Sequence, residues 1–443
     1  MNIQISEYFT YRKLIRFVLP SVIMMIFTSI YGVIDGYFVS NVAGKTAFAA
    51  VNLVMPFVMI LGGMGFMIGT GGTALVSKTL GEGNKEKANQ YFSMMIIFAV
   101  LLGIILIIAG ILLIRPVAVL FGASEAMLED CVAYGRTVIS FTCAFMLQNI
   151  FQTFLVAAEK PKFGLYTTIA AGVTNIVLDT LFIAVFRWGV TGAALATGIS
   201  QCIGGIIPLI YFLRPNSSRL RLVKTKLSFR PILQACINGS SELMSNVSVS
   251  LVSVVYNLQL MKYIGENGVS AYGVLMYVQF IFNAVFMGFT IGSAPIIGFN
   301  YGSGDTDRLK NMLKMGVKMM LITGAVLTVL AMLLSVPLTS LFVGYDKELY
   351  ELTLHAFRLF AFSFLLAGYN VFCSGFFTAL NNGGVSACIS FLRTLVFQLL
   401  SVLFLPFIFD TEGIWYAITI AEICAFIIST IFLFAKKNKY HYM

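Results

Sequence analysis

Residues 91–114 read YFSMMIIFAVLLGIILIIAGILLI, and this stretch decides the fold class because it contains no charged side chain. About 20 apolar residues in a helix are enough to cross the hydrocarbon core of a bilayer. The rest of the chain has the same character, since 59% of its 443 residues are hydrophobic and only 11% are charged. Soluble domains carry about 45–50% apolar and 25% charged residues. The composition therefore excludes soluble, disordered and disulfide-rich proteins and predicts an all-α polytopic membrane protein.

Eleven further apolar stretches of spanning length predict 12 transmembrane helices in total. The predicted spans cover residues 14–39, 48–76, 91–114, 132–154, 165–186, 189–212, 232–261, 271–298, 312–336, 352–378, 385–409 and 414–434. The longest connection, residues 214–230, is basic and lies near the middle of the chain. We expect it to be a linker between an N-lobe (residues 1–213, spans 1–6) and a C-lobe (residues 231–443, spans 7–12).

The net charge of +10 is explained by the orientation of these spans. If both termini are cytoplasmic, 21 of the 29 Lys and Arg residues fall inside the cell and five fall outside. This alternation follows the positive-inside rule. It predicts a multi-pass protein of the cell (inner) membrane with both termini in the cytoplasm. The basic linker is accordingly interpreted as an anchor against anionic membrane lipid, and no nucleic-acid partner is expected.

The sequence also repeats at half its length. Gly81-Glu-Gly83-Asn84 recurs 221 residues later as Gly302-Ser-Gly304-Asp305. Two further segments, 50–55 and 116–121, recur at the same offset. Six spans per half is an even number, so both halves enter the membrane from the same side. They are predicted to be two parallel six-helix lobes related by a pseudo-two-fold axis along the membrane normal, an arrangement typical of alternating access.

Four acidic residues inside the spans are functional candidates, because hydrocarbon makes a buried charge costly. They are Asp35, Asp179, Glu242 and Glu422. Asp179 follows Asn175 by one helical turn, which places both side chains on one helix face. If Asp35 and Asp179 face each other, they can share a proton or hold Na⁺ with amide and hydroxyl oxygens. The alternative is that they only hold helices together by hydrogen bonds.

The polar residues of the second half have less certain roles. Glu242 is expected near the start of span 7, where it either contacts a cation or substrate or caps the helix. Glu422 is expected to pair with an arginine or a backbone group, whereas Arg393 is expected to extend toward the membrane interface. Further polar residues either line a cavity or pack between helices; they are Tyr31, Gln148, Gln152, Tyr256, Gln279 and Asn283.

Several short motifs in a fixed order carry a family resemblance. Leu19-Pro20 precedes Asp35 in span 1, the motif at 81–84 follows span 2, Asn175-Ile-Val-Leu-Asp179 lies in span 5, and Gly192-Ala-Ala-Leu-Ala-Thr197 lies in span 6. With these motifs the chain resembles the multidrug and toxic compound extrusion (MATE) family over essentially all twelve spans. It resembles in particular the MepA-like and DinF-like bacterial branch.

The resemblance implies roles for individual residues. Asp35, Asn175, Asp179 and Thr197 would form a cation site in the N-lobe, and Pro20 would permit bending of span 1. NorM-like members carry a second cation site in the C-lobe; Glu242 matches its glutamate, but Asn370 stands where an aspartate is expected. That departure favours coupling through the N-lobe. MepA-like members differ at the span-1 acid, so Asp35 indicates the DinF-like pattern of coupling.

The sequence therefore predicts a monomeric antiporter that exports small amphipathic, often cationic compounds in exchange for H⁺ or Na⁺, without a cofactor. The alternative in the same superfamily is a flippase for lipid-linked oligosaccharides, for which a basic cavity is expected. A channel or a membrane-embedded enzyme is disfavoured, because the half-length repeat suits alternating access. The sequence also contains no evident nucleophile–base pair, and two histidines and seven dispersed cysteines do not indicate a metal site.

Overall fold

Helices make up most of the chain, because a bilayer offers backbone polar groups no partners outside a helix or a closed barrel. The structure, a computed structural model, describes residues 3–39, 42 and 45–443. The first half forms α1 (Tyr11–Phe38), α2 (Lys45–Gly81), α3 (Lys85–Leu120), α4 (Glu125–Ser140), α5 (Thr142–Ala157), α6 (Pro161–Asp179), the π-helical segment η2 (Thr180–Val185) and α7 (Gly189–Leu213). The second half forms α8 (Phe229–Tyr263), α9 (Glu266–Gly302), α10 (Thr306–Val343), α11 (Lys347–Ala361), α12 (Phe364–Ala379), α13 (Gly383–Phe391), the π-helical segment η3 (Leu392–Phe397), α14 (Gln398–Phe404) and α15 (Pro406–Tyr440).

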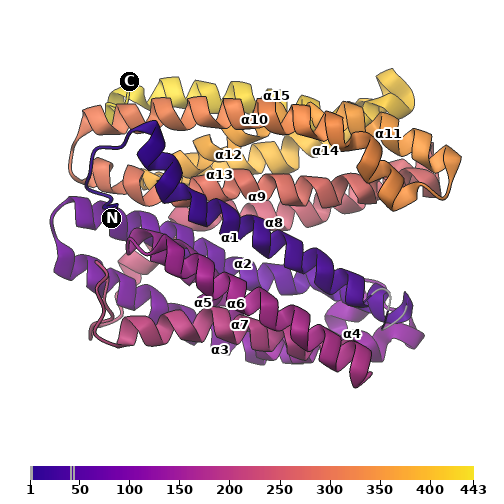
Figure 1. Cartoon of the computed structure of the whole chain (residues 1–443), viewed down its shortest axis with the longest axis horizontal. Coiled ribbons are helices and arrows are strands. Elements are labelled where there is room, and N and C mark those ends of the chain that lie inside the picture. Colours follow the sequence, from indigo (N-terminus) through magenta and orange to yellow (C-terminus); the bar gives the residue numbers. More distant parts are fainter. Residues whose placement is uncertain (1–2, 40–41, 43–44) are drawn as a thin grey trace.

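Within the described residues, ten helical segments are long and apolar enough to cross a membrane. Two further pairs, α4 with α5 and α11 with α12, are bent by 53° and 47° and each pass as one broken span. The total is then the predicted twelve. Both chain ends and the linker lie at one end of the bundle, which we call the terminal end (Figure 1).

The internal repeat is visible in the backbone. Gly83 and Gly304 both adopt positive φ values, 81° and 70°, in the turns after α2 and α9. Glu159 and Asn381 also adopt positive φ values, 61° and 58°, although side chains make this conformation unfavourable. Positions with positive φ thus recur at nearly the same offset as the sequence motifs.

Small residues let the two halves meet closely toward the terminal end. The backbone of Gly71 in α2 lies against Gly239 in α8. At the offset of 221 the equivalent residues are Gly292 in α9 and Val18 in α1, and these also lie in contact. Two matching contacts are what a two-fold axis between the halves requires. The predicted two-lobe architecture with parallel repeats is therefore confirmed.

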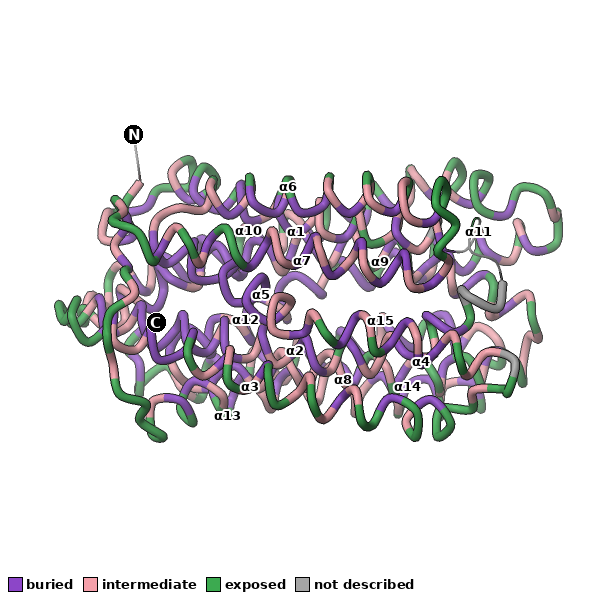
Figure 2. Tube along the Cα trace, turned by 90° about the horizontal axis from the view of Figure 1, so that it is seen from below, coloured by how far each residue is buried: buried purple, intermediate pink, exposed green. Residues whose placement is uncertain are grey.

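The outer surface of the bundle is apolar. Buried positions lie on the helix faces turned inward, and exposed positions follow the outer faces (Figure 2). Large apolar side chains on these outer faces include Leu112, which is 73% exposed, and Ile105, which is 61% exposed. Apolar surface of this extent marks contact with lipid rather than with water. The chain is a multi-span membrane protein.

The linker between the halves is hydrogen-bonded to α3 along part of its length. The backbone N–H of Arg221 donates to the Asn89 Oδ1 atom at 2.9 Å, and the N–H of Val223 donates to the Ser93 Oγ atom at 2.8 Å. Both acceptors are buried. The linker therefore connects the halves across the terminal end while it stays attached to the first half.

Candidate functional site

Three helices of the first half bring together three of the predicted cation-site residues. Asp35 lies in α1, Asp179 is the last residue of α6, and Thr197 lies in α7. The carboxyl group of Asp35 lies beside the carboxyl group of Asp179 and the Thr197 hydroxyl, close enough to interact with both. Asp35 is 9% exposed and Asp179 is fully buried. We call these three residues the acid cluster.

The acid cluster lacks a positive partner within the part of the chain that the structure describes. Two carboxyl groups share a hydrogen bond only if one of them carries a proton, because ionised carboxylates are acceptors alone. In the structure, neither oxygen of Asp179 has a hydrogen-bond partner among the described residues, and neither does the Thr197 hydroxyl. The cluster can therefore accept a proton or a small cation between its two acids.

A buried amide and a π-helical segment lie next to Asp179 on the same stretch of chain. Asn175, one turn earlier on α6, is 1% exposed, and its Oδ1 atom has no hydrogen-bond partner among the described residues. The π-helical segment η2 begins directly after Asp179. Such segments are rare and occur often at functional sites. Asn175 thus supplies a free amide oxygen on the helix that carries Asp179.

One residue of this region was missed by the sequence reasoning. Tyr134 in α4 is 1% exposed and interacts electrostatically with both Asp35 and Asp179. The only signal in the sequence is a tyrosine inside a span, which is weak because the ring is apolar and the chain contains 19 tyrosines. The position of Tyr134 near the two acids follows from how α4 packs, which a single sequence does not reveal.

The second half contains a different buried cluster, which we call the ion-pair cluster: Arg393 in η3, Glu422 in α15 and Asn370 in α12. The Arg393 Nε atom lies 2.9 and 3.0 Å from the two carboxylate oxygens of Glu422, and its Nη2 atom lies 2.7 Å from Oε1. The Asn370 amide donates to Glu422 Oε2 at 2.7 Å and to the Glu422 backbone oxygen at 2.9 Å.

This geometry confirms that Glu422 pairs with an arginine. The expectation that Arg393 extends toward the membrane interface is wrong. The Glu422 carboxylate lies within reach, and an ion pair in a medium of low dielectric constant outweighs the alternative. The side chains of Arg393 and Glu422 are only 13% and 3% exposed.

Glu242 is placed differently from the prediction. Helix α8 begins at Phe229 and Ser228 occupies its N-cap position, so the alternative that Glu242 caps a helix is wrong. Glu242 lies in the interior of α8, is half-buried, and interacts electrostatically with Arg393. Asn370, the other residue considered for a C-lobe cation site, donates a hydrogen bond from its amide nitrogen to Glu422.

The remaining predicted residues of the first half lie on α1 and α5. Tyr31 lies close enough to Gln148 to interact with it, and both Gln148 and Gln152 are 4% exposed. The side-chain oxygen of each glutamine has no hydrogen-bond partner among the described residues. Pro20 lies inside α1, which continues through it as a helix.

The remaining predicted residues of the second half lie on α8 and α9. Tyr256 is 1% exposed and stacks on Tyr272 with ring centroids 4.9 Å apart. Its hydroxyl has no hydrogen-bond partner within the described chain. Gln279 and Asn283 are half-buried on α9. These positions are compatible with either a cavity wall or packing between helices.

A duplicated twelve-helix bundle with buried acids defines a membrane transporter of the two-lobe type. A family model for MatE matches residues 20–181 and again residues 243–403. The chain therefore belongs to the MatE family, and the two matches, one in each half, agree with the internal repeat.

Similar proteins carry names of the same kind. The chain is 27% identical over 422 residues to "Multidrug export protein MepA" of Staphylococcus saprophyticus, covering 94% of this chain and 92% of that protein. It is 24% identical over 418 residues to the protein of the same name from Staphylococcus aureus, with the same coverage of both chains. A solved structure described as an outward-facing conformation of a multidrug resistance MATE family transporter superposes with a TM-score of 0.92 at 21% identity, covering 98% of each chain.

Proposed function

We propose that this protein is an antiporter that exports small amphipathic, often cationic compounds in exchange for H⁺ or Na⁺. The observation that carries the proposal is the acid cluster: two buried carboxyl groups in contact, without a positive side chain to neutralise them among the described residues. A cation that binds between Asp35 and Asp179 removes their repulsion, so the cluster binds cations more tightly in the conformation that brings the acids together. A ligand shifts a two-state equilibrium only through such a difference in affinity.

The proposed lobes are residues 1–213 and 231–443, joined by the linker 214–230, and they rock against each other so that the contacts near the terminal end break and re-form. We propose that the terminal end faces the cytoplasm. A hollow of about 910 Å³ lies there between α3 and the linker, and Lys87, Lys224 and Lys226 line it. Lysines at this level suit the anionic headgroups of an inner leaflet. Under this orientation, the contact between the halves at the terminal end supports an outward-facing state.

The related alternative, a flippase for lipids that carry pyrophosphate, needs a basic interior. In the described chain the buried guanidinium of Arg393 is already neutralised by Glu422. The buried acids of the first half remain unneutralised. The distribution of charge thus favours cationic cargo over anionic lipid.

Transport in proteoliposomes with imposed pH or sodium gradients, using a panel of fluorescent organic cations, tests the proposal. Asp35→Asn is expected to abolish ion-driven export while folded protein still reaches the membrane. Asp307→Asn, the same chemical change in the first turn of α10 at the terminal end, is the matched control and is expected to leave export unchanged. Full gradient-driven export by Asp35→Asn would defeat the assignment, and movement of a lipid-linked oligosaccharide without any ion gradient would favour the flippase.

A further inference from the structure

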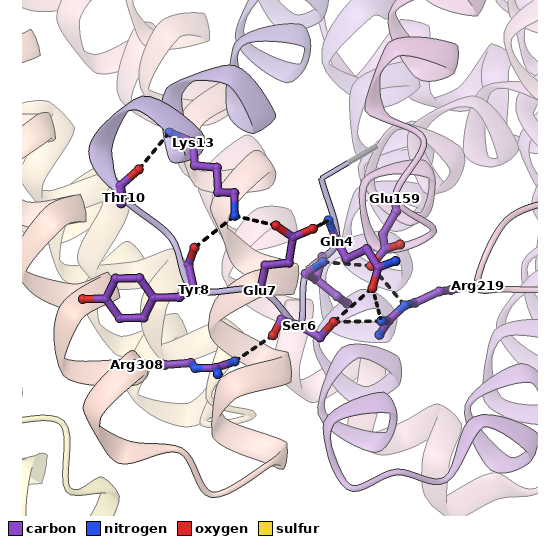
Figure 3. Close-up of polar contacts among 10 residues, drawn as sticks. Gln4, Ser6, Glu7, Tyr8, Thr10, Lys13, Glu159, Arg219 and Arg308 are labelled. Atoms are coloured by element: carbon purple, nitrogen blue, oxygen red, sulfur yellow. Dashed lines mark hydrogen bonds and ion pairs between the residues drawn. The ribbon is translucent and has the colours of Figure 1, made fainter. Parts of the chain in front are cut away.

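The chain begins with a short non-helical segment that is unusually well fixed for a terminus. Residues 3–10, which we call the strap, precede α1 and lie across the terminal end (Figure 3). Ile5 is fully buried and Phe9 is 3% exposed. The Phe9 ring packs edge-on against Phe17, with centroids 5.8 Å apart. Terminal residues are poorly ordered unless they are tied down, so these two anchors indicate a docked segment.

The strap is bonded to the first half through Glu159, in the turn between α5 and α6. The backbone N–H of Ile5 donates to the Glu159 Oε1 atom at 2.8 Å. The same oxygen lies 3.0 Å from the Nε atom of Arg219, a linker residue. The Arg219 Nη2 atom in turn donates to the Ser6 hydroxyl at 2.9 Å. Glu159 and Arg219 thus hold the strap from two sides.

The strap is also bonded to the second half, through α10. The Arg308 Nη1 atom donates to the backbone oxygen of Ser6 at 2.7 Å, and the Asn311 amide donates to the backbone oxygen of Phe9 at 3.1 Å. Arg219 reaches the second half as well, because its guanidinium lies over the Phe299 ring of α9, 5.4 Å from the centroid. The strap is therefore bonded to both halves at once and connects them across the terminal end.

We propose that the strap is a latch that stabilises the conformation in which the terminal end is closed. The inference rests on the proposed alternating access, in which the two halves separate at this end. Separation moves Glu159 away from Arg308 and Asn311, so the strap cannot keep its bonds to both halves. Opening must break the bonds to α10 or pull Ile5 out of its buried position. The latch thereby raises the free energy of the open state relative to the closed one.

The strap also acts on the charge of Glu159. Burial raises the pKa of Glu159 and the carboxylate of Glu7 adds to the rise, whereas the Ile5 N–H bond and the cations of Arg219 and Lys160 lower it. Glu7 itself bonds to Lys13 and to the Gln4 backbone, within the strap and the start of α1. Glu159 is therefore the acid that links the strap to the rest of the first half.

The test measures the distance between the halves at the terminal end by double electron–electron resonance. Spin labels are placed at Lys162 and Asp307, near the starts of α6 and α10, in a cysteine-free background that still transports dye. Arg308→Gln combined with Asn311→Ala removes both bonds to α10 and leaves the strap in place. Because one of the two bonds is charge-assisted, we expect the ratio of open to closed molecules to rise about tenfold or more.

A second variant lacks residues 2–9 and is expected to show the same or a larger rise. Tyr8→Ala is the matched control, because Tyr8 is 57% exposed and its side chain makes none of these contacts. Its ratio is expected to stay at the wild-type value. If wild type shows two distances and the Arg308/Asn311 variant keeps the wild-type ratio, the latch is refuted while alternating access stands. An equal rise in Tyr8→Ala also refutes it, and a single distance in every protein under every gradient refutes both proposals.

Discussion

The ion-pair cluster gives the sharpest prediction for stability. Arg393→Met removes the guanidinium but leaves the Glu422 carboxylate, whose side chain is 3% exposed, with only the Asn370 amide as donor among the described side chains. The carboxylate loses three N–O contacts of 3.0 Å or less. An unpaired buried charge of this kind costs about 3–5 kcal/mol of unfolding free energy.

The double variant Arg393→Met/Glu422→Gln separates the ion pair from packing. Its glutamine can still accept the Asn370 hydrogen bond, and the cluster no longer contains a buried charge. Because replacing both partners of a buried pair is often neutral or stabilising, we expect its unfolding free energy to lie within about 1 kcal/mol of wild type or above it. The measurement is a denaturant titration of the purified protein in detergent, followed by circular dichroism.

Arg358→Met is the matched control, since Arg358 is an exposed arginine in the last turn of α11. A surface change of this type alters the unfolding free energy by about 0.5 kcal/mol or less. The reasoning is wrong if Arg393→Met costs no more than Arg358→Met. It is also wrong if the double variant is as unstable as the single one, because packing rather than charge would then explain the loss.

Three further predictions address the acid cluster, the contact between the halves and the strap. Asp179→Asn removes a like-charge contact, so it is expected to raise the unfolding free energy while it abolishes export; denaturation and transport assays on one preparation check both. Gly239→Ala places a methyl group against the Met67 carbonyl oxygen, and overpacking of this kind costs about 1–3 kcal/mol; distance measurements are expected to show more molecules open at the terminal end. Since burial raises the pKa of Glu159, the folded protein binds a proton there more readily than the unfolded chain. The stability that this residue contributes should therefore be present below the ordinary carboxylate pKa and be lost as the pH rises through the raised value; denaturant titrations at several pH values check this, and Glu159→Gln should lose the dependence.

Much of the fold could be predicted because a bilayer demands long apolar helices and the sequence supplies them. The helix ends are less predictable, since helices continue into the headgroup region where hydropathy no longer marks them. Helix α8 spans Phe229–Tyr263, against a predicted span of 232–261. The predicted spans 4 and 10 also proved to be broken, at Phe141 and near Phe362. Neither position is a proline or glycine, so no local signal marks the break.

The site could be predicted only in part, for a related reason. An acid inside a span is conspicuous, and Asp35 and Asp179 were found in this way. Which way each helix turns its acid depends on packing between helices, so the sequence could suggest that the two acids meet but could not establish it. Tyr134 was missed because nothing in its own span distinguishes it from a packing residue.

The repeat makes the chemical difference between the halves informative. At the offset of 221 the equivalent of Asp35 is Tyr256, and at the offset of 222 that relates Glu159 to Asn381 the equivalent of Asp179 is Ser401. Both acids of the cluster are thus replaced by hydroxyl-bearing residues in the second half.

Each half nevertheless places a buried charge beside a π-helical segment, η2 after Asp179 and η3 around Arg393. In the first half those charges are acids without a cation among the described side chains, whereas in the second half a guanidinium of the chain itself is bonded to Glu422. A side-chain cation cannot leave its site, so the second half has no place at Glu422 for an exchangeable ion. Under the proposed function, ion exchange therefore belongs to the first half, and Glu242 is the acid of the second half that stays available to cationic cargo.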